Sequence, residues 1–417
     1  MPLDARALSI PRGWWIAAIA IFALRIALLM LSTPLHRALT GDEPLYDDVA
    51  RSVLAGRGFM HAGATWVGRP PGWPLLLAGI YLFVGTSPHY AVIFQGLFDA
   101  GTALLFAWLA FRIYRSRLAT CFVFLTVALW PPFLRESRFL QTDPSFTFAL
   151  AAMVALFFRF SLVPSWTRAI VVGLVIGVAT LIRPAGPAPA AGLILGFLLT
   201  HRHRLRQDAP RLLVILAVGA LVLAPWTIRN ALRFHAFVPL SVGGGQQLLL
   251  GSLPDTDGRW DAARWPQIAT PILAYESARL GRTPDPIEAD RAFLRIGLMT
   301  WRRHPMQSLT LYVKRLWRLC LLPVSEGDRP VLRIVFLLVL LVLYALAVPQ
   351  AISGWRSRDP AVSYTGVLAL SFALYAVTTS IVYTNSRYIE PLRPFILLLA
   401  AGMVARRPAK RTSILPG

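Results

Sequence analysis

The chain has 417 residues, of which 56% are hydrophobic and only 15% are charged, and its formal net charge is +22. Soluble domains carry about 25% charged residues, and the apolar residues here form runs of about 20, which match the thickness of a bilayer's hydrocarbon core. The composition therefore predicts an all-α polytopic membrane protein. It excludes a soluble domain and also a transmembrane barrel, whose strands would alternate in short segments. The basic residues gather in short loops, as the positive-inside rule describes, so we expect no nucleic-acid partner.

About ten segments have the length and apolarity of transmembrane helices. They are 13–33, 89–111, 118–134, 144–162, 168–182, 184–200, 211–228, 331–350, 361–382 and 390–405. The first run lacks a clear small-residue cleavage site, so we interpret it as a span and not as a cleaved signal peptide. With both termini inside, the most basic loops fall on the inner side. The outward loops are then 34–88, 135–143, 183, 229–330 and 383–389.

Two further apolar segments, 73–86 and 306–323, are predicted to be interfacial helices. The first is short and rich in proline, and the second carries several cations on one helical face. Counting both as spans would invert the middle of the protein, although twelve or thirteen spans remain the alternative. We expect three regions: an N-terminal transmembrane module with the first two outer loops (1–228), an outer loop region with amphipathic helices (229–330), and C-terminal transmembrane helices (331–417).

The first outer loop contains an unusually acidic stretch, TGDEPLYDDVARSVLAGRGF, at residues 40–59. Asp42, Glu43, Asp47 and Asp48 lie within seven positions of each other, in a chain with only 20 acidic residues. The pattern predicts a surface helix with Asp42 as its N-cap. Carboxylates at a helix N-terminus interact favourably with the helix dipole, which explains Asp42 or Glu43 without any function. It explains the two later aspartates less well.

Arginines also gather on the predicted outer face, where the positive-inside rule disfavours them. They are Arg57, Arg69, Arg135, Arg138, Arg183, Arg229, Arg233 and Arg387. Because the guanidinium fork binds phosphate bidentately, such a set suggests an anionic ligand at the membrane boundary. Asp143 lies on the same side, where the simplest explanation is an N-cap followed by Pro144 at the first helical position. Together, the carboxylates and arginines indicate chemistry on a lipid-linked phosphate, in which a carboxylate takes a proton from a hydroxyl and arginines stabilise the leaving phosphate.

Several motifs, taken in order, give the chain a resemblance to a known family. They are GDEPLYDDVARSVLAGRGF, GRPPGWPLL, QTDPSF, LIRPAGP, APWTIRNALRFHAFVPLSVGGGQQLLLG and NSRYIEPLRP. The set resembles the GT-C superfamily of polyprenyl-phosphate-dependent glycosyltransferases, in the bacterial branch related to aminoarabinose transferases and protein O-mannosyltransferases. The resemblance extends over nearly the whole chain, and it implies a GT-C-like helical bundle.

The resemblance also implies roles for individual residues. Asp42 would be the principal catalytic carboxylate, acting as base toward the acceptor, and Asp143 a second acidic residue that helps to bind or position substrate. Arg69 would contact the lipid phosphate, and Arg387 would be another anion contact. The remaining candidates for substrate binding are Glu43, Arg138, Arg183, Arg229 and Tyr388. One departure is Gly68, which stands where some relatives have an acidic residue.

The implied function is that of an integral membrane glycosyltransferase, a hexosyl- or pentosyltransferase. It would move a sugar from a polyprenyl-phosphate donor to a hydroxyl of a lipid, glycan or protein acceptor, with inversion. The reaction would take place at the periplasmic face of the bacterial inner membrane, with no cofactor or divalent metal required. The alternative is a transporter or flippase of lipid-linked sugars, which would place ionisable residues within its spans. Here the span interiors are nearly free of charge, with Arg25 and Asp99 as exceptions that we expect to pair; a scaffold protein would not need the outer carboxylates and arginines.

Overall fold

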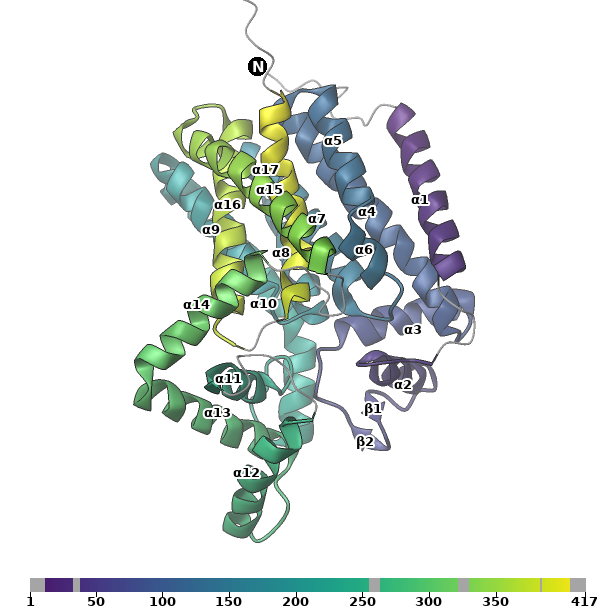
Figure 1. Cartoon of the computed structure of the whole chain (residues 1–417), viewed down its shortest axis with the longest axis vertical. Helices are drawn as coiled ribbons and strands as arrows, with labels where there is room; N and C mark the ends of the chain where they lie inside the picture. The colour runs from purple at the N-terminus through teal and green to yellow at the C-terminus, as the bar shows by residue number, and fades with distance from the viewer. Residues whose placement is uncertain (1–11, 33–37, 255–262, 322–329, 383–384, 406–417) are drawn as a thin grey trace, which may run out of the picture.

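The computed structural model describes residues 12–32, 38–254, 263–321, 330–382 and 385–405, and these form a bundle of helices (Figure 1). The strands in these ranges are β1 (Met60–His61) and β2 (Ala64–Thr65), which pair as one antiparallel hairpin. The predicted all-α class is therefore confirmed.

The ten predicted spans all correspond to helices. They are α1 (Arg12–Ser32), α4 (Pro88–Tyr114), α5 (Arg117–Ala128), α7 (Thr142–Leu162), α8 (Trp166–Ile182), α9 (Pro187–Thr200), α10 (Leu205–Phe234), α15 (Pro330–Arg356), α16 (Pro360–Thr379) and α17 (Arg393–Ala405). Among the described residues, seven helical segments are long and apolar enough to cross a membrane, one of which joins α5 to the short helix α6 (Pro131–Glu136). The helices α1, α8 and α9 contribute shorter apolar segments.

The bundle has a protein-filled centre and a lipid-facing periphery. The apolar windows of α7 and of the segment ending in α17 are 72% and 78% buried, whereas those of α10 and α15 are 22% and 17% buried. The centre holds α7 and α17 because their side chains face other helices on all sides, as in the Phe106–Phe395 ring contact between α4 and α17. The helix α10 packs mainly along α8, and α15 packs along α16 and α17.

The two segments predicted to be interfacial helices form α3 (Gly72–Val84) and α14 (Pro305–Leu321). Figure 1 shows α3 running across the lower end of the bundle and α14 slanting away from it. A Cβ atom on Gly72 would lie 2.5 Å from the carbonyl carbon of Leu181, so α3 begins in direct backbone contact with the end of α8. This contact fixes the segment before α3 close to Arg183, which follows α8.

Arg25 and Asp99, which the sequence places in the interiors of two spans, are paired as expected. Arg25 on α1 forms an ion pair with Asp99 on α4, and its Nε donates to the carbonyl oxygen of Ala128 at 2.9 Å. Ser137 donates a hydrogen bond to the same aspartate. A buried charge is tolerated only when it is paired and hydrogen-bonded, so this network holds α1 against α4 and the end of α5.

The remaining elements gather at one end of the bundle, which is the lower end in Figure 1. They are α2 (Glu43–Leu54), the β1–β2 hairpin, α11 (Gly244–Ser252), α12 (Trp265–Leu280) and α13 (Pro286–Arg303). The predicted amphipathic helix is α13, which begins with a capping box between Asp285 and Glu288. The division into regions 1–228, 229–330 and 331–417 stays a prediction.

Candidate active site

Asp42 is the N-cap residue of α2, as predicted, but its side chain makes no capping hydrogen bond. Its Oδ1 atom instead lies 3.4 Å from Nη2 of Arg69, in the segment before α3. The side chain is 39% exposed, so the carboxylate is paired and still accessible to a ligand.

The other three carboxylates of the acidic stretch have structural partners. The Glu43 side chain is fully buried and accepts hydrogen bonds from the backbone N–H groups of Thr40 (2.9 Å) and Leu140 (2.8 Å). The remaining pairs are Asp47 with Arg51 and Tyr81, and Asp48 with His61 and the backbone N–H of Ala62. They attach α2 to the loop before α7, to α3 and to the hairpin. This geometry favours a structural role for Glu43 over the predicted substrate contact.

Asp143 is not the N-cap of α7, so that part of the prediction is wrong. The N-cap is Gln141, whose backbone is extended, and Thr142 already begins the helix. Asp143 therefore lies in the first turn, where the dipole favours a carboxylate. Its Oδ1 accepts a hydrogen bond from Nη2 of Arg183 at 3.1 Å, and its Oδ2 lies 3.6 Å from Nε of Arg387.

Arg183 and Arg387 are held by aromatic and backbone contacts. The guanidinium carbon of Arg183 lies 5.3 Å from the ring centre of Phe146 and 5.6 Å from that of Tyr388, within the range of a cation–π contact. Arg387 and Tyr388 belong to η4 (Ser386–Leu392), a short 3₁₀ helix that precedes α17. The hydroxyl of Tyr375 on α16 donates to the backbone oxygen of Tyr388 at 2.7 Å, which fixes the turn.

A buried ion pair anchors the other end of η4. Glu390 is 1% exposed and accepts a hydrogen bond from the indole N–H of Trp130 at 2.8 Å. Its other oxygen lies 3.3 Å from Nε of Arg393, which also donates to the backbone oxygen of Cys320. The turn that carries Arg387 is thus positioned by residues from three separate parts of the chain.

Glu136 is a third carboxylate of the site, and the sequence reasoning missed it. Its Oε2 lies 3.9 Å from Nη1 of Arg387, and its Oε1 accepts a hydrogen bond from Arg135 at 2.8 Å. Its side chain is only 8% exposed. The available signal was its place in the second outer loop, where it follows Arg135 in the stretch LRESRF.

Tyr46 on α2 lies near both the Asp42–Arg69 pair and the arginines that contact Asp143. It is 5% exposed, and burial raises the pKa of its hydroxyl to about 12. The charges of Arg69, Asp42, Arg183 and Arg387 all act on this hydroxyl. The two predicted catalytic carboxylates therefore belong to one neighbourhood, which we call the carboxylate–arginine cluster. It consists of Asp42, Arg69, Glu136, Asp143, Arg183 and Arg387.

The cluster is polar but incompletely satisfied. Among the described residues, Asp143 Oδ2, Arg183 Nη1 and Arg387 Nε are buried atoms without a hydrogen-bond partner. Asp143 Oδ2 and Arg387 Nε face each other as an ion pair at 3.6 Å, just beyond hydrogen-bond distance. Buried polar atoms of native proteins are nearly always hydrogen-bonded, so these atoms could bind a ligand. Two of the three are cationic donors.

A hollow of about 550 Å³ borders the cluster on one side, and we call it the α9–α16 hollow. Its walls are Arg183, Pro184, Ala185, Pro187, Ala188, Ala191, Gln247, Leu374, Tyr375, Thr378, Thr379, Val382 and Tyr388. Most of these side chains are apolar, and the charge is concentrated at Arg183. The hollow thus combines a volume typical of ligand sites with a cationic end.

The structure places two predicted binding residues outside the cluster. The guanidinium carbon of Arg229 lies 4.6 Å from the ring centre of Trp226, and the group donates to the backbone oxygen of Trp66 at 2.9 Å. This arrangement favours a structural role in the outer loops. Arg138 lines a different groove, between α1 and α6.

The glycine at position 68 also has a structural reason. A Cβ atom there would lie 2.4 Å from the ring of Trp66. Any larger side chain at position 68 would therefore require the ring of Trp66 to move. The backbone oxygen of Gly68 accepts a hydrogen bond from Nη1 of Arg69, which helps to aim that side chain.

Comparisons with known proteins agree with this architecture. Residues 68–228, less than half of the chain, match the model of the dolichyl-phosphate-mannose-protein mannosyltransferase family. The crystal structure of the Archaeoglobus fulgidus oligosaccharyltransferase, tethered to an acceptor peptide containing the NVT sequon, matches with a TM-score of 0.56 and 15% identity. The match covers 94% of this chain and 49% of that chain, so this chain spans about half its length. The chain has a GT-C-like fold.

The expected resemblance to the GT-C superfamily is thereby confirmed. ArnT from Cupriavidus metallidurans bound to undecaprenyl phosphate also matches, with a TM-score of 0.47 and 14% identity over 95% of this chain and 78% of that chain. No curated protein matches the chain. The family-model match includes Arg69, Asp143 and Arg183 of the GT-C-like bundle, whereas Asp42 and Arg387 lie outside the matched residues.

Proposed function

We propose that this protein transfers a sugar from a polyprenyl-phosphate donor to an acceptor hydroxyl. The observation that carries the proposal is the carboxylate–arginine cluster, in which two buried guanidinium N–H groups lack hydrogen-bond partners among the described residues beside a largely apolar hollow. The helical bundle and the match to a mannosyltransferase family model support membrane glycosyl transfer at the coarser level.

The donor is amphipathic, and the site is amphipathic in the same way. In the proposal the phosphate is bound between Arg183 and Arg387, whose open N–H groups form charge-assisted hydrogen bonds to its oxygens. The polyprenyl chain extends into the α9–α16 hollow, away from the charges. Asp143 and Glu136 hold the two arginines in place, and so the site stays nearly charge-balanced until the phosphate arrives.

The chemistry is a single displacement at the anomeric carbon. Asp42 accepts the proton of the acceptor hydroxyl, whose oxygen forms the new glycosidic bond. The bond between the anomeric carbon and the phosphate oxygen breaks, and the electron pair remains on the leaving polyprenyl phosphate. Arg183 and Arg387 stabilise that growing negative charge, and one donor of this kind is worth a factor of about 10² to 10³ in rate. A single displacement inverts the anomeric centre.

We further propose that the cluster faces the periplasm of a bacterial inner membrane. The turn between α4 and α5, which includes Arg115 and Arg117, lies at the opposite end of the bundle from α2 (Figure 1). The positive-inside rule assigns that basic end to the cytoplasm, together with both termini. In the proposal arginines supply the positive charge that the phosphate needs, and neither a metal nor a cofactor is required. Within the described ranges, no three His, Cys, Asp or Glu side chains are arranged to hold a metal ion.

Asp42→Asn tests the assignment, and Asp48→Asn is the matched control on the same helix. Because a general base contributes a factor of about 10² to 10⁴, we expect Asp42→Asn to lose at least a hundredfold in transfer. Asp48→Asn should stay within a factor of about two, because the Asp48 carboxylate bonds to His61 and Ala62 of the hairpin and is not part of the cluster. The measurement is release of polyprenyl phosphate from a labelled sugar donor by purified protein. A normally folded and active Asp42→Asn variant would rule out this base, and translocation of the donor without a new glycosidic bond would favour a flippase.

A further inference from the structure

Buried polar side chains on α4 hold the loop that connects α6 to α7. Gln95 is fully buried and Asp99 is 4% exposed, and they lie one turn apart on α4. The Nε2 atom of Gln95 donates to the backbone oxygen of Phe139 in this loop at 2.9 Å. The hydroxyl of Ser137, the C-cap residue of α6, donates to Asp99. Polar side chains inside a span are costly, and the ion pair of Asp99 with Arg25 does not account for these bonds to the loop.

The loop held in this way connects two carboxylates of the cluster. Glu136 precedes it and Asp143 follows it, and both carboxylates lie close to Arg387, with Oε2 of Glu136 at 3.9 Å from Nη1 and Oδ2 of Asp143 at 3.6 Å from Nε. Near its other end, the backbone N–H of Leu140 donates to the buried carboxylate of Glu43 at 2.8 Å. Because buried groups on α4 and α2 fix both parts of the loop, they set where the two carboxylates lie around Arg387.

The hydroxyl of Ser137 has one proton and two acceptors within reach. They are the carboxylate of Asp99 and the backbone oxygen of Phe133, which lies 2.7 Å away within α6. A hydrogen bond to an ionised acceptor is about twice as strong as one between neutral groups, so the proton goes to Asp99. Without Asp99 the hydroxyl would still bond to Phe133, and α6 would keep its helical geometry but lose this hydrogen bond to α4.

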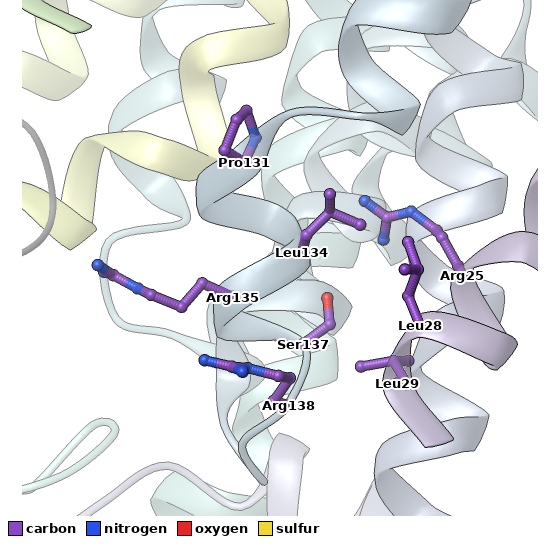
Figure 2. A pocket seen from close by; sticks show the side chains of 8 residues that line it. All are labelled: Arg25, Leu28, Leu29, Pro131, Leu134, Arg135, Ser137 and Arg138. Atoms are coloured by element: carbon purple, nitrogen blue, oxygen red, sulfur yellow. The ribbon is translucent and has the colours of Figure 1, made fainter. Parts of the chain in front are cut away.

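Arg25 supplies the charge that the buried carboxylate of Asp99 requires. Its side chain is 1% exposed, it pairs with Asp99, and its Nε donates to the backbone oxygen of Ala128 at 2.9 Å. Figure 2 shows the guanidinium group directed from α1 toward Leu134 on α6, and Arg25 and Ser137 line the same groove between these helices. Removing one half of a buried pair leaves the other charge uncompensated, so a test of this pair has to change both charges together.

From these contacts we infer that Asp99 is a positioning residue for the phosphate site, although it lies within a span and does not touch the substrate. The coupling passes from Asp99 through Ser137 to Glu136, and from Glu136 to the guanidinium group of Arg387. Arg25 balances the charge of Asp99. Small displacements of the groups that act on a transition state are costly, so the position of this loop affects the rate. This inference rests on the proposed function, in which Arg387 stabilises the leaving phosphate.

Ser137→Ala tests the coupling, because it removes the hydrogen bond to Asp99 and leaves both buried charges in place. Thr102→Val is the matched control, because Thr102 is 1% exposed on the same helix as Asp99 and its hydroxyl donates to Phe98 within α4. The measurement is release of polyprenyl phosphate from a labelled sugar donor by the purified full-length protein. We expect Ser137→Ala to lower kcat about tenfold and Thr102→Val to stay within a factor of about two. An unchanged kcat in Ser137→Ala would overturn the inference.

A double-mutant cycle determines whether the effect passes through Glu136. In a Glu136→Gln background the contact with Arg387 is already weakened, so Ser137→Ala should lower kcat by less than about twofold. If Ser137→Ala lowers kcat by the same factor in both backgrounds, Ser137 acts without Glu136 and the inference is wrong.

Two double variants separate the hydrogen bond from the ion pair. Arg25→Gln/Asp99→Asn removes both charges and keeps an acceptor oxygen for Ser137, so kcat should stay within about threefold of the wild-type value. Arg25→Gln/Asp99→Ala removes both charges and the acceptor, so kcat should fall about tenfold. An equal loss in the two double variants would show that the pair only anchors α1, which contradicts a positioning role.

Binding of farnesyl phosphate, a short polyprenyl phosphate, separates this inference from the function on which it rests. We expect the dissociation constant to rise about fivefold in Ser137→Ala and to stay unchanged in Thr102→Val, because only the first displaces Arg387. If the wild-type protein binds farnesyl phosphate but transfers no sugar to any component of a total lipid extract, the proposed function fails. In that case equal affinity in the two variants also overturns the positioning role, and a difference in affinity supports it. A wild-type protein that binds no farnesyl phosphate contradicts both.

Discussion

Glu43→Ala separates the structural carboxylate of α2 from its catalytic neighbour. The Glu43 carboxylate is fully buried and accepts three hydrogen bonds, from Thr40 N at 2.9 Å, Thr40 Oγ1 at 3.2 Å and Leu140 N at 2.8 Å. A hydrogen bond to a charged group contributes about 1.5–3 kcal/mol, and a buried N–H left without a partner costs about 1–3 kcal/mol. These terms overlap, so we expect the free energy of unfolding to fall by about 3–5 kcal/mol, the usual cost of breaking a buried charged contact.

The isosteric change Glu43→Gln keeps one acceptor oxygen for these donors, so its cost should be smaller, at about 1–2 kcal/mol. The assay is thermal unfolding in detergent, followed by tryptophan fluorescence, with Asp42→Asn as the comparison. The expected order of stability is wild type and Asp42→Asn together, then Glu43→Gln, then Glu43→Ala. Transfer per folded molecule should be lost in Asp42→Asn and retained in Glu43→Gln. A Glu43→Ala variant with wild-type stability and no transfer would show that Glu43 contacts substrate.

Three further predictions concern the cluster and its supports. Arg387→Gln should lower kcat by about 10² to 10³; more than a tenth of the wild-type kcat would contradict its role at the phosphate. Glu390→Gln removes the charge opposite Arg393, so hydrogen exchange should speed up across 386–392 and kcat should fall about tenfold or more, because small displacements of positioning groups are costly; an unchanged exchange rate would show that the turn is held otherwise. The backbone N–H of Ala62 lowers the pKa of Asp48 below its unfolded value of about 3.9. The resulting stability is complete above that value and is lost as the pH falls through the folded pKa, so exchange in the hairpin should rise in acid, and Asp48→Asn should remove this dependence.

The sequence predicts the bundle well because the bilayer imposes a strong rule on it. Every spanning segment must be apolar and helical, and the positive-inside rule then orders the loops. The pairing of Arg25 with Asp99 was predictable for the same reason, because an unpaired charge within a span is too costly. The placement of Asp42, Asp143 and Arg387 at one end of the bundle followed from topology, since their loops were all assigned to one side.

Side-chain partners within the outer loops were not predictable in the same way. Glu136 follows Arg135 in the sequence, and only the fold brings Arg387 within 3.9 Å of it. Arg229 and Arg138 satisfy the rule that selected the outer arginines, but Arg229 lies over the ring of Trp226 and Arg138 lines the groove between α1 and α6. Position relative to the membrane indicates which end of the bundle a residue occupies, and it does not indicate which way the side chain turns.

The acidic stretch shows how a candidate catalytic carboxylate can be distinguished from structural ones. Each of its carboxylates lies where it could cap the helix, accept a hydrogen bond from the backbone or form an ion pair. Glu43 and Asp48 accept hydrogen bonds from backbone N–H groups, and Asp47 accepts one from Tyr81. Asp42 occupies the capping position without making the capping bond, and its carboxylate lies beside Arg69 instead. The backbone of Asp42 is helical (φ −83°, ψ −6°) and not extended, so its side chain is not placed to bond the first N–H groups of α2. The ion pair with Arg69 therefore orients this carboxylate toward the cluster, where it stays 39% exposed.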